Sequence, residues 1–168
     1  VVARVCGLCA IVHSTCYTLA CEELLGLEVP KRASYLRIIA NELDRIHSHL
    51  LCLAHTAENA GFEALFMRTM KDRELIMEAQ ETITGNRVQF DYICIGGVNK
   101  DITTDIEKIA REKLSLLKQK VAEIEELFLN NWSLSLKYKG VGVITNESAL
   151  RCSVLGPLAR ASGVDFDV

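Results

Sequence analysis

Hydrophobic residues recur every three to four positions through most of this chain, which is the spacing of amphipathic α-helices. This spacing predicts a helix over residues 9–25, which Gly26 would end. It also predicts a long helix over residues 30–61, opened by a proline and closed by a glycine. A third helix is expected over residues 64–84, with Gly85 as its stop.

The pattern changes after the third helix. Residues 87–95 alternate loosely between apolar and polar side chains, which favours a short extended segment in front of two glycines. Helical spacing returns over residues 101–130, and a capping box from Thr104 to Glu107 is predicted at the start of this fourth helix. The remaining residues, 138–168, show little helical period apart from a short turn over 147–151.

These elements predict a mainly α fold. We expect a multihelical bundle of long amphipathic helices with a small, loop- and strand-rich C-terminal edge. No internal repeat, low-complexity tract or linker interrupts the pattern. Residues 1–168 are therefore predicted to form a single helical domain.

Composition limits the possible functions of the chain. It has 168 residues, 49% of them hydrophobic and 24% charged, and its net charge is −3 with both signs interleaved, so we expect no nucleic-acid partner. Charged residues interrupt every long apolar stretch, which excludes a transmembrane segment of its own. The seven cysteines are an odd number scattered through predicted helices, and no secretory signal is visible, so a reducing, cytoplasmic setting is expected.

The chemistry-bearing motif is the pair Cys6 and Cys9, two thiols at Cys-x-x-Cys spacing. Such a pair can bind a metal ion, form a redox disulfide or supply half of a zinc site, and spacing alone does not choose among these. The predicted helix starts at this motif, where free N–H groups favour thiolates. His13 lies four residues beyond Cys9 and Tyr17 four further on, so all three should share one helical face.

Other cysteines and histidines receive simpler interpretations. Three cysteines are expected to fill the core as small apolar groups: Cys16, Cys21 and Cys52. Three histidines on the second helix do not share one face, and we interpret them as helix-surface or subunit-interface residues: His47, His49 and His55.

Residues 4–13 carry the pattern Arg-x-Cys-Gly-x-Cys-x-x-x-His, which resembles the N-terminal metal motif of nickel-iron hydrogenase large subunits. Further segments, in the same order, resemble the branch formed by membrane-bound, energy-converting (Ech-type) hydrogenases and the quinone-site subunit of respiratory complex I. These segments are CYTLACE (16–22), VPKRA (29–33), NELDRI (41–46), IGGVNKD (95–101) and GPLARASG (156–163). The resemblance therefore covers nearly the whole chain.

The resemblance implies an oxidoreductase parent that oxidises H2 and reduces protons reversibly, coupled to ferredoxin- or quinone-type electron transfer. It implies a nickel-iron centre in which Cys6 is a terminal nickel ligand, Cys9 bridges nickel and iron, and His13 donates a hydrogen bond toward the bridging sulfur. These three residues are the predicted catalytic group. Tyr17, where complex I relatives have a quinone-binding tyrosine, and Arg160 of the GPLAR segment are the predicted cofactor-binding residues. Implied partners are an iron-sulfur small subunit and membrane subunits, with the parent bound peripherally at the cytoplasmic face.

Two departures from the family pattern concern completeness. The second Cys-x-x-Cys is missing, because Cys94 and Cys152 are isolated, and so is the upstream segment with a proton-accepting glutamate. The chain is therefore interpreted as an internal fragment that is inactive alone, with an incomplete or absent metal centre and possible self-association through exposed interfaces.

Two alternatives remain open. The first is a complex-I-like NADH:quinone oxidoreductase subunit, although its relatives have generally lost the cysteine pair and Asn59 stands where they often carry an aspartate. The second is a non-catalytic helical binding module whose Cys-x-x-Cys holds zinc or nothing.

Overall fold

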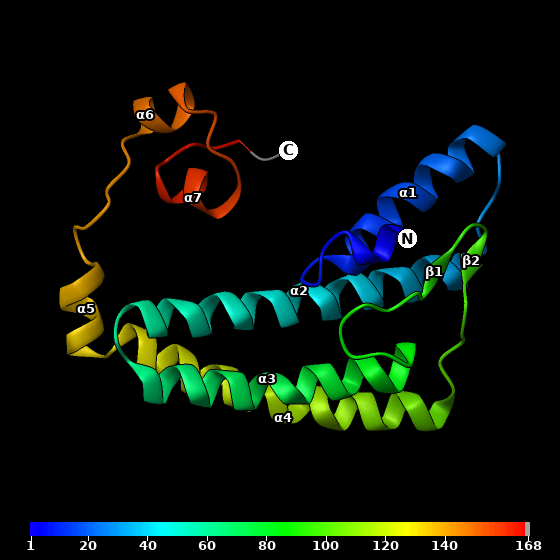
Figure 1. Cartoon of the computed structure of the whole chain (residues 1–168), viewed down its shortest axis with the longest axis horizontal. Coiled ribbons are helices and arrows are strands. Elements are labelled where there is room, and N and C mark those ends of the chain that lie inside the picture. The colour runs from blue at the N-terminus through cyan, green and yellow to red at the C-terminus, as the bar shows by residue number, and fades with distance from the viewer. Residues whose placement is uncertain (167–168) are drawn as a thin grey trace. The chain divides into compact units, whose positions relative to one another are not determined.

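The computed structural model describes residues 1–166 and has the predicted mainly α architecture (Figure 1). Its first elements are a 3-10 turn, η1 (Val2–Arg4), and three helices, α1 (Ala10–Leu25), α2 (Lys31–Asn59) and α3 (Glu63–Thr84). A hairpin of β1 (Ile93–Cys94) and β2 (Gly97–Val98) follows, and then come α4 (Thr104–Leu129), α5 (Trp132–Tyr138), α6 (Asn146–Arg151) and α7 (Gly156–Ala161). The four long helices expected from the sequence are confirmed.

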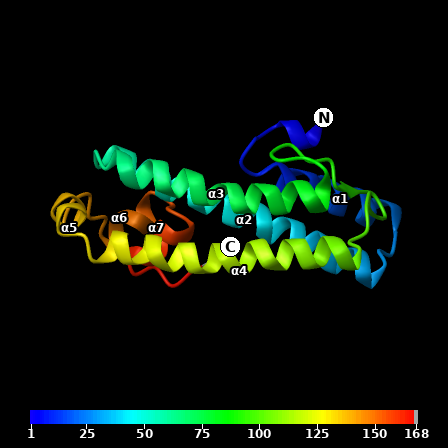
Figure 2. The ribbon, with the colours of Figure 1, turned by 90° about the horizontal axis from the view of Figure 1, so that it is seen from below.

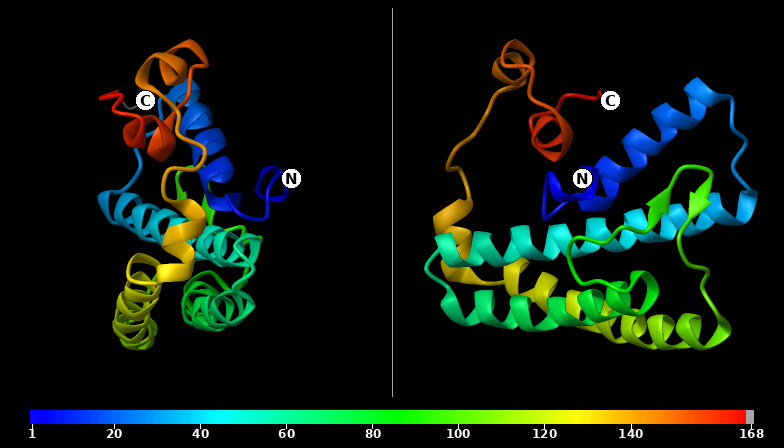
Figure 3. Two further views of the ribbon diagram at one scale, coloured as in Figure 1. Left: turned by 90° about the vertical axis from the view of Figure 1, so that its left-hand side faces the viewer. Right: turned by 45° about the vertical axis from the view of Figure 1, so that its right-hand side comes forward.

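The chain forms two compact units, Val1–Glu126 and Leu127–Val168, which are described separately. In the first, α2 and α3 run antiparallel, and the part of α4 in this unit lies along them, so that three long helices form a triangular bundle (Figures 2 and 3). Ion pairs Lys113–Glu78 and Arg68–Glu123 join α4 to α3. The prediction of a single helical domain for residues 1–168 stays a prediction.

The α2–α3 interface is the main core of the first unit. The two helices are joined by a tight turn in which Gly61 has a φ of 75°, a conformation that favours glycine. Small and branched side chains are buried along it, among them Ala40, Leu43, Ile76 and Ala79. Close packing of this kind holds both helices in a fixed register, which matters because α2 also supports the start of α1.

A buried ion pair ties α1, α2 and the hairpin together. Glu22 of α1 accepts two hydrogen bonds from Arg37 of α2, and it also accepts one from the backbone N–H of Gly96 at the hairpin turn (2.7 Å). Arg37 in turn donates to the carbonyls of Gly97 (3.0 Å) and Cys94 (2.8 Å). The same charged pair therefore binds the backbone of both strands of the hairpin, in which Ile93 lies opposite Val98.

Some local expectations were wrong. The cap of α4 is Thr103, one residue before the predicted Thr104, because its hydroxyl accepts from the N–H of Ile106 (3.4 Å); Glu107 is then one position too late to close a capping box. Of the extended segment predicted over 87–95, only Ile93–Cys94 is a strand.

The second unit contains short helices where loops and strands were expected. Asn131 and Thr145 cap α5 and α6 by accepting from Leu134 N–H (3.0 Å) and Ser148 N–H (3.2 Å). A small core of Ala149, Ala159 and Val164 joins α6 to α7. The predicted turn over 147–151 is confirmed as α6. Within residues 1–166, no helix is long and apolar enough to cross a membrane.

Candidate metal centre

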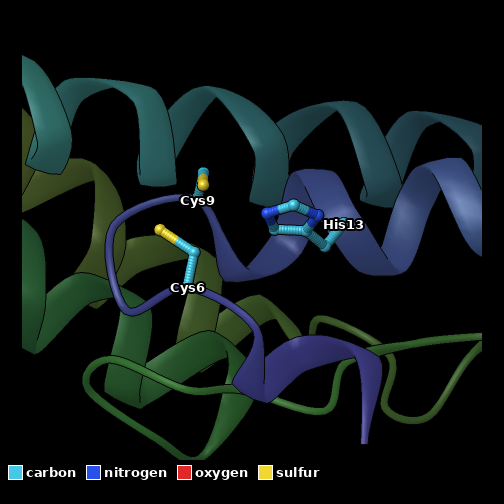
Figure 4. A group of neighbouring side chains, drawn as sticks. All are labelled: Cys6, Cys9 and His13. Carbon is cyan, nitrogen blue, oxygen red and sulfur yellow. The ribbon is translucent and has the colours of Figure 1, made fainter.

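Cys6, Cys9 and His13 converge at the start of α1 (Figure 4). One ligand atom from each residue, two sulfurs and one imidazole nitrogen, lies within 4.8 Å of the others. All three side chains are partly buried, so the group is reachable from solvent and backed by protein. The helical offset of four residues between Cys9 and His13 produces this convergence, as the sequence predicted.

The local backbone explains how the two thiols meet. The chain leaves η1 and turns through Gly7 and Leu8, so that Cys6 lies in the loop and Cys9 at the N-cap of α1. The Sγ atom of Cys6 accepts a hydrogen bond from the backbone N–H of Leu8 (3.3 Å). The first turn of α1 is closed by the N–H of His13, which donates to the carbonyl of Cys9 (3.2 Å).

The two thiols have opposite pKa shifts. The thiol of Cys9 donates a hydrogen bond to Cys6, and with the N–H of Leu8 this lowers the pKa of Cys6. The same bond, together with burial, raises the pKa of Cys9 to about 11. Cys6 is therefore the thiol that ionises first, and a cation that binds both must displace the proton of Cys9.

The buried carboxylate of Asp44 lies close enough to influence both thiols. Asp44 of α2 is only 1% exposed, and burial raises its pKa to about 6, although a hydrogen bond from the backbone N–H of Ile11 opposes this shift. The negative charge of Asp44 also raises the pKa values of Cys6 and Cys9. Asp44 therefore acts electrostatically on both thiols of the group.

Two buried residues extend this arrangement into the α2–α3 interface. His47 lies one turn beyond Asp44, and burial together with the charge of Arg73 lowers its pKa to about 4. Arg73 of α3 contacts the Nε2 atom of His47 and donates from Nε to the His47 carbonyl (3.2 Å). His47 is thus a neutral imidazole in the core.

Several sequence expectations need correction here. His47 is fully buried, whereas His49 and His55 are exposed as predicted. Cys16 and Cys52 are exposed and Cys21 is half-buried, so these thiols do not fill the core; α1 packs through Ala10, Ile11 and other residues on a different face.

The predicted cofactor-binding residues lie outside the group formed by Cys6, Cys9 and His13. Tyr17 is 53% exposed, and its hydroxyl interacts with the thiol of Cys21, which raises the pKa of Tyr17. Arg160 lies on α7 in the second unit, where it is exposed. Their roles in binding a cofactor stay predictions.

Asp44 and Arg73 lie near the site, although no motif in the sequence singles them out. A signal existed, because Asp44 and His47 lie next to Leu43 and Leu50 on the apolar stripe of α2. A charged residue at a core position needs a partner or a shifted pKa, so its place on the apolar stripe indicates an unusual environment.

The donor set suits a soft or borderline metal ion. Thiolates and imidazole are preferred ligands of nickel, iron and zinc, and three such donors within 4.8 Å supply part of a coordination shell. Among the described residues, this group offers three donors, one fewer than a closed tetrahedral site requires.

A separate groove of about 660 Å³ lies between α2 and α4 and has a different character. Its lining includes Tyr35, Ile39 and Leu114 and contains no cysteine or histidine among the described residues. Its charged rim is neutralised by the ion pairs Arg32–Asp101 (2.8 Å) and Arg111–Glu107 (2.8 Å). The groove therefore offers apolar contact rather than metal or redox chemistry.

Comparison with known protein families divides the chain near the end of α2. Residues 1–57 match the family described as nickel-dependent hydrogenase, and residues 59–168 match the 49 kDa subunit of respiratory-chain NADH dehydrogenase. Cys6, Cys9 and His13 all lie within the hydrogenase match.

Similar proteins come from both groups. The alpha subunit of a membrane-bound hydrogenase of Pyrococcus furiosus is 35% identical over 98% of this chain and 38% of its own length. The carbon monoxide-induced hydrogenase of Rhodospirillum rubrum is 37% identical over 98% of the chain and 46% of its own length. An NADH-quinone oxidoreductase subunit of Trichlorobacter lovleyi is 39% identical over 90% of the chain and 39% of its own length. The chain thus spans less than half the length of these relatives.

Proposed function

Because the chain belongs to the family formed by nickel-dependent hydrogenases and the 49 kDa subunit of respiratory-chain NADH dehydrogenase, we propose that it is part of the large subunit of an energy-converting nickel-iron hydrogenase. The observation that carries the proposal is the convergence of Cys6, Cys9 and His13, which retains the thiol pair that a metal centre needs. In this assignment the described residues form one half of the centre.

Each residue of the group has a distinct role. Cys6 and Cys9 would hold the centre as thiolates, and His13 would donate a hydrogen bond toward the Cys9 sulfur that fixes its orientation. A nickel-iron centre, when bound, supplies the heterolytic cleavage of H2 and the reverse reduction of protons. Cys6 lies in the loop before α1 and is reachable from solvent, so it would be the thiolate open to proton exchange.

The proposal also concerns partners and place. The remaining thiolates must come from outside these residues, because the sequence holds no second Cys-x-x-Cys. Electrons would leave through an iron-sulfur small subunit toward ferredoxin- or quinone-type carriers, and membrane subunits would hold the complex at the cytoplasmic face. The 168-residue chain alone is expected to have no hydrogenase activity.

A second candidate is a quinone-reducing subunit. It is supported by the match of residues 59–168 to the NADH dehydrogenase subunit and by the exposed side chain of Tyr17. In that case the thiol pair would have no catalytic role.

Activity assays on the complete complex separate the two candidates. We expect Cys9→Ser to abolish H2-dependent reduction of methyl viologen, whereas Cys16→Ser, an exposed cysteine on the same helix, should leave it unchanged. A complex that reduces quinone, shows no H2-dependent activity and tolerates Cys9→Ser would support the second candidate instead.

A further inference from the structure

The groove between α2 and α4 has one charged end and an apolar interior. Its α2 wall includes a single helical stripe, in which every fourth residue faces the groove: Lys31, Tyr35, Ile39 and Leu43. Lys31 is the first residue of α2, and the rest of this stripe is aromatic or aliphatic. The groove therefore runs from a cation at the start of α2 to a buried leucine about 18 Å further along the helix.

Buried side chains from three helices also line the groove. Leu36 of α2, Ile83 of α3 and Ala110 of α4 are each at most 7% exposed. Tyr35 and Ile39, in contrast, are 58% and 41% exposed, although both belong to the lining. Apolar side chains that stay open to solvent along a concave surface are typical of a ligand site. The groove is thus shaped and lined for an apolar ligand.

The size of the groove decides between a helix and a thinner ligand. A volume of about 660 Å³ spread over about 18 Å corresponds to a mean cross-section of roughly 40 Å². An α-helix with its side chains is about 10–12 Å wide, which gives a cross-section of about 80–110 Å². The groove is therefore too narrow to enclose a helix, and it suits an extended hydrocarbon chain.

The charges at the rim indicate the head group of such a ligand. Arg32 is paired with Asp101. Arg111 is paired in the same way with Glu107. Lys31 is exposed and forms no ion pair with any residue that the structure describes. The first turn of α2 also contains no acidic residue and has no side-chain cap, so the positive end of the helix dipole adds to the charge of Lys31. This end of the groove therefore favours one negative charge.

We propose that the groove between α2 and α4 binds one long-chain fatty acid. The carboxylate lies at Lys31 and the start of α2, and the hydrocarbon chain lies along Tyr35, Ile39 and Leu43. None of the lining residues belongs to the candidate metal centre, so this inference goes beyond the proposed hydrogenase function and does not depend on it.

Isothermal titration calorimetry of the 168-residue chain with myristate, kept below its critical micelle concentration, tests the site. We expect saturable binding of one myristate per chain. Laurate is two methylene groups shorter and should bind about fifteenfold more weakly, because each buried methylene group contributes about fourfold to the affinity. A wild-type chain that binds no myristate, or that binds both acids equally well, would overturn the proposal.

One pair of variants tests where the hydrocarbon chain lies. Ile39→Trp places a larger side chain in the groove and should reduce myristate affinity at least about tenfold. Ile38→Trp is the matched control, because Ile38 is the neighbouring exposed isoleucine and lies outside the lining, and it should keep the wild-type affinity. Equal myristate affinity in Ile39→Trp and the wild type would show that the ligand binds elsewhere.

A second pair tests the head group. Lys31→Gln should weaken myristate binding about threefold to fivefold, and should leave the binding of myristyl alcohol, which has the same chain without the charge, unchanged. Lys108→Gln, an exposed lysine of α4 outside the lining, should bind myristate as the wild type does. Since Lys31 is exposed, this pair remains informative even if Ile39→Trp does not fold. Unchanged myristate affinity in Lys31→Gln would contradict the assigned orientation.

Other occupants of the groove would give different results. Binding to phosphatidylglycerol vesicles without binding of free myristate would assign this face to a membrane surface and overturn the proposal. Analytical ultracentrifugation tests for a second copy of the chain. A dimer that Ile39→Trp dissociates and that myristate does not affect would assign the groove to that second copy, and would equally overturn the proposal.

Discussion

The guanidinium of Arg37 and the carboxylate of Glu22 form a two-pronged ion pair inside the first unit, with Nη2–Oε1 at 2.6 Å and Nη1–Oε2 at 2.9 Å. Both side chains are more than nine-tenths buried. Since the same two residues also bind the backbone of the hairpin, this pair determines how α1 lies on α2. The positions of Cys9 and His13 at the other end of α1 depend on that placement.

Glu22→Gln should therefore be strongly destabilising. The substitution leaves the charge of Arg37 buried without a counter-ion, which costs about 3–5 kcal/mol of unfolding free energy. Urea unfolding measures the loss. Asp101→Asn, which breaks the exposed pair with Arg32, is the control and should cost less than about 1 kcal/mol. Equal losses in the two variants would contradict the central role of the buried pair.

The shifted pKa values of Asp44 and His47 should make the free energy of unfolding depend on pH in the acid range. Burial raises the pKa of Asp44 to about 6, so its contribution to stability falls as pH rises from about 4 to 6. The pKa of His47 is lowered to about 4, so its contribution rises over about pH 4 to 6.5, and the two effects oppose each other in the wild type.

Asp44→Asn removes one side of this balance. Between pH 4 and 6.5 its unfolding free energy should increase by about 2 kcal/mol more than that of the wild type. Urea unfolding across this range is the measurement, with Glu42→Gln as an exposed control that should follow the wild type. Parallel curves for Asp44→Asn and the wild type would show that the pKa of Asp44 is not raised as described.

Alkylation should distinguish the two thiols of the motif. Because a hydrogen bond from Cys9 lowers the pKa of Cys6 and raises that of Cys9, iodoacetamide at neutral pH should modify Cys6 at least about tenfold faster. Mass spectrometry of timed samples measures both rates. Added Co²⁺ should protect both thiols and leave the exposed Cys16 reactive. Faster modification of Cys9 than of Cys6 would contradict the hydrogen-bond direction.

Side chains around the thiols should affect metal binding unequally. His13→Gln removes the imidazole from the group and should weaken Co²⁺ binding roughly tenfold. Tyr17→Phe should leave Co²⁺ binding, followed by its thiolate charge-transfer absorption, unchanged, since the Tyr17 hydroxyl interacts with Cys21 rather than with Cys6 or Cys9. Loss of binding in Tyr17→Phe would extend the site along α1.

The sequence predicts those parts of this protein that depend on local spacing. The four long helices follow from their apolar period, and Cys9 and His13 meet because four residues make about one helical turn. The short helices α5 and α7 have too few residues to show an apolar period. Thr103 and Thr104 are equivalent as N-cap candidates in the sequence, and only the backbone conformation shows that Thr103 is the cap.

Contacts between distant residues could not be predicted from spacing. Glu22 and Arg37 lie on separate helices and meet the hairpin only after both have packed. Arg73 of α3 donates to the His47 carbonyl of α2 across an interface that the pattern of either helix alone does not define. These buried polar residues interrupt the apolar stripes, and that interruption is the only trace they leave in the sequence.

The nickel and iron content of the full-length subunit, purified from its native maturation background, tests the central claim most directly. The proposal predicts roughly one nickel and one iron per subunit, retained in Cys16→Ser and lost in Cys9→Ser. A subunit that carries neither metal although Cys6 and Cys9 are intact would contradict the assignment of these thiols to a nickel-iron centre.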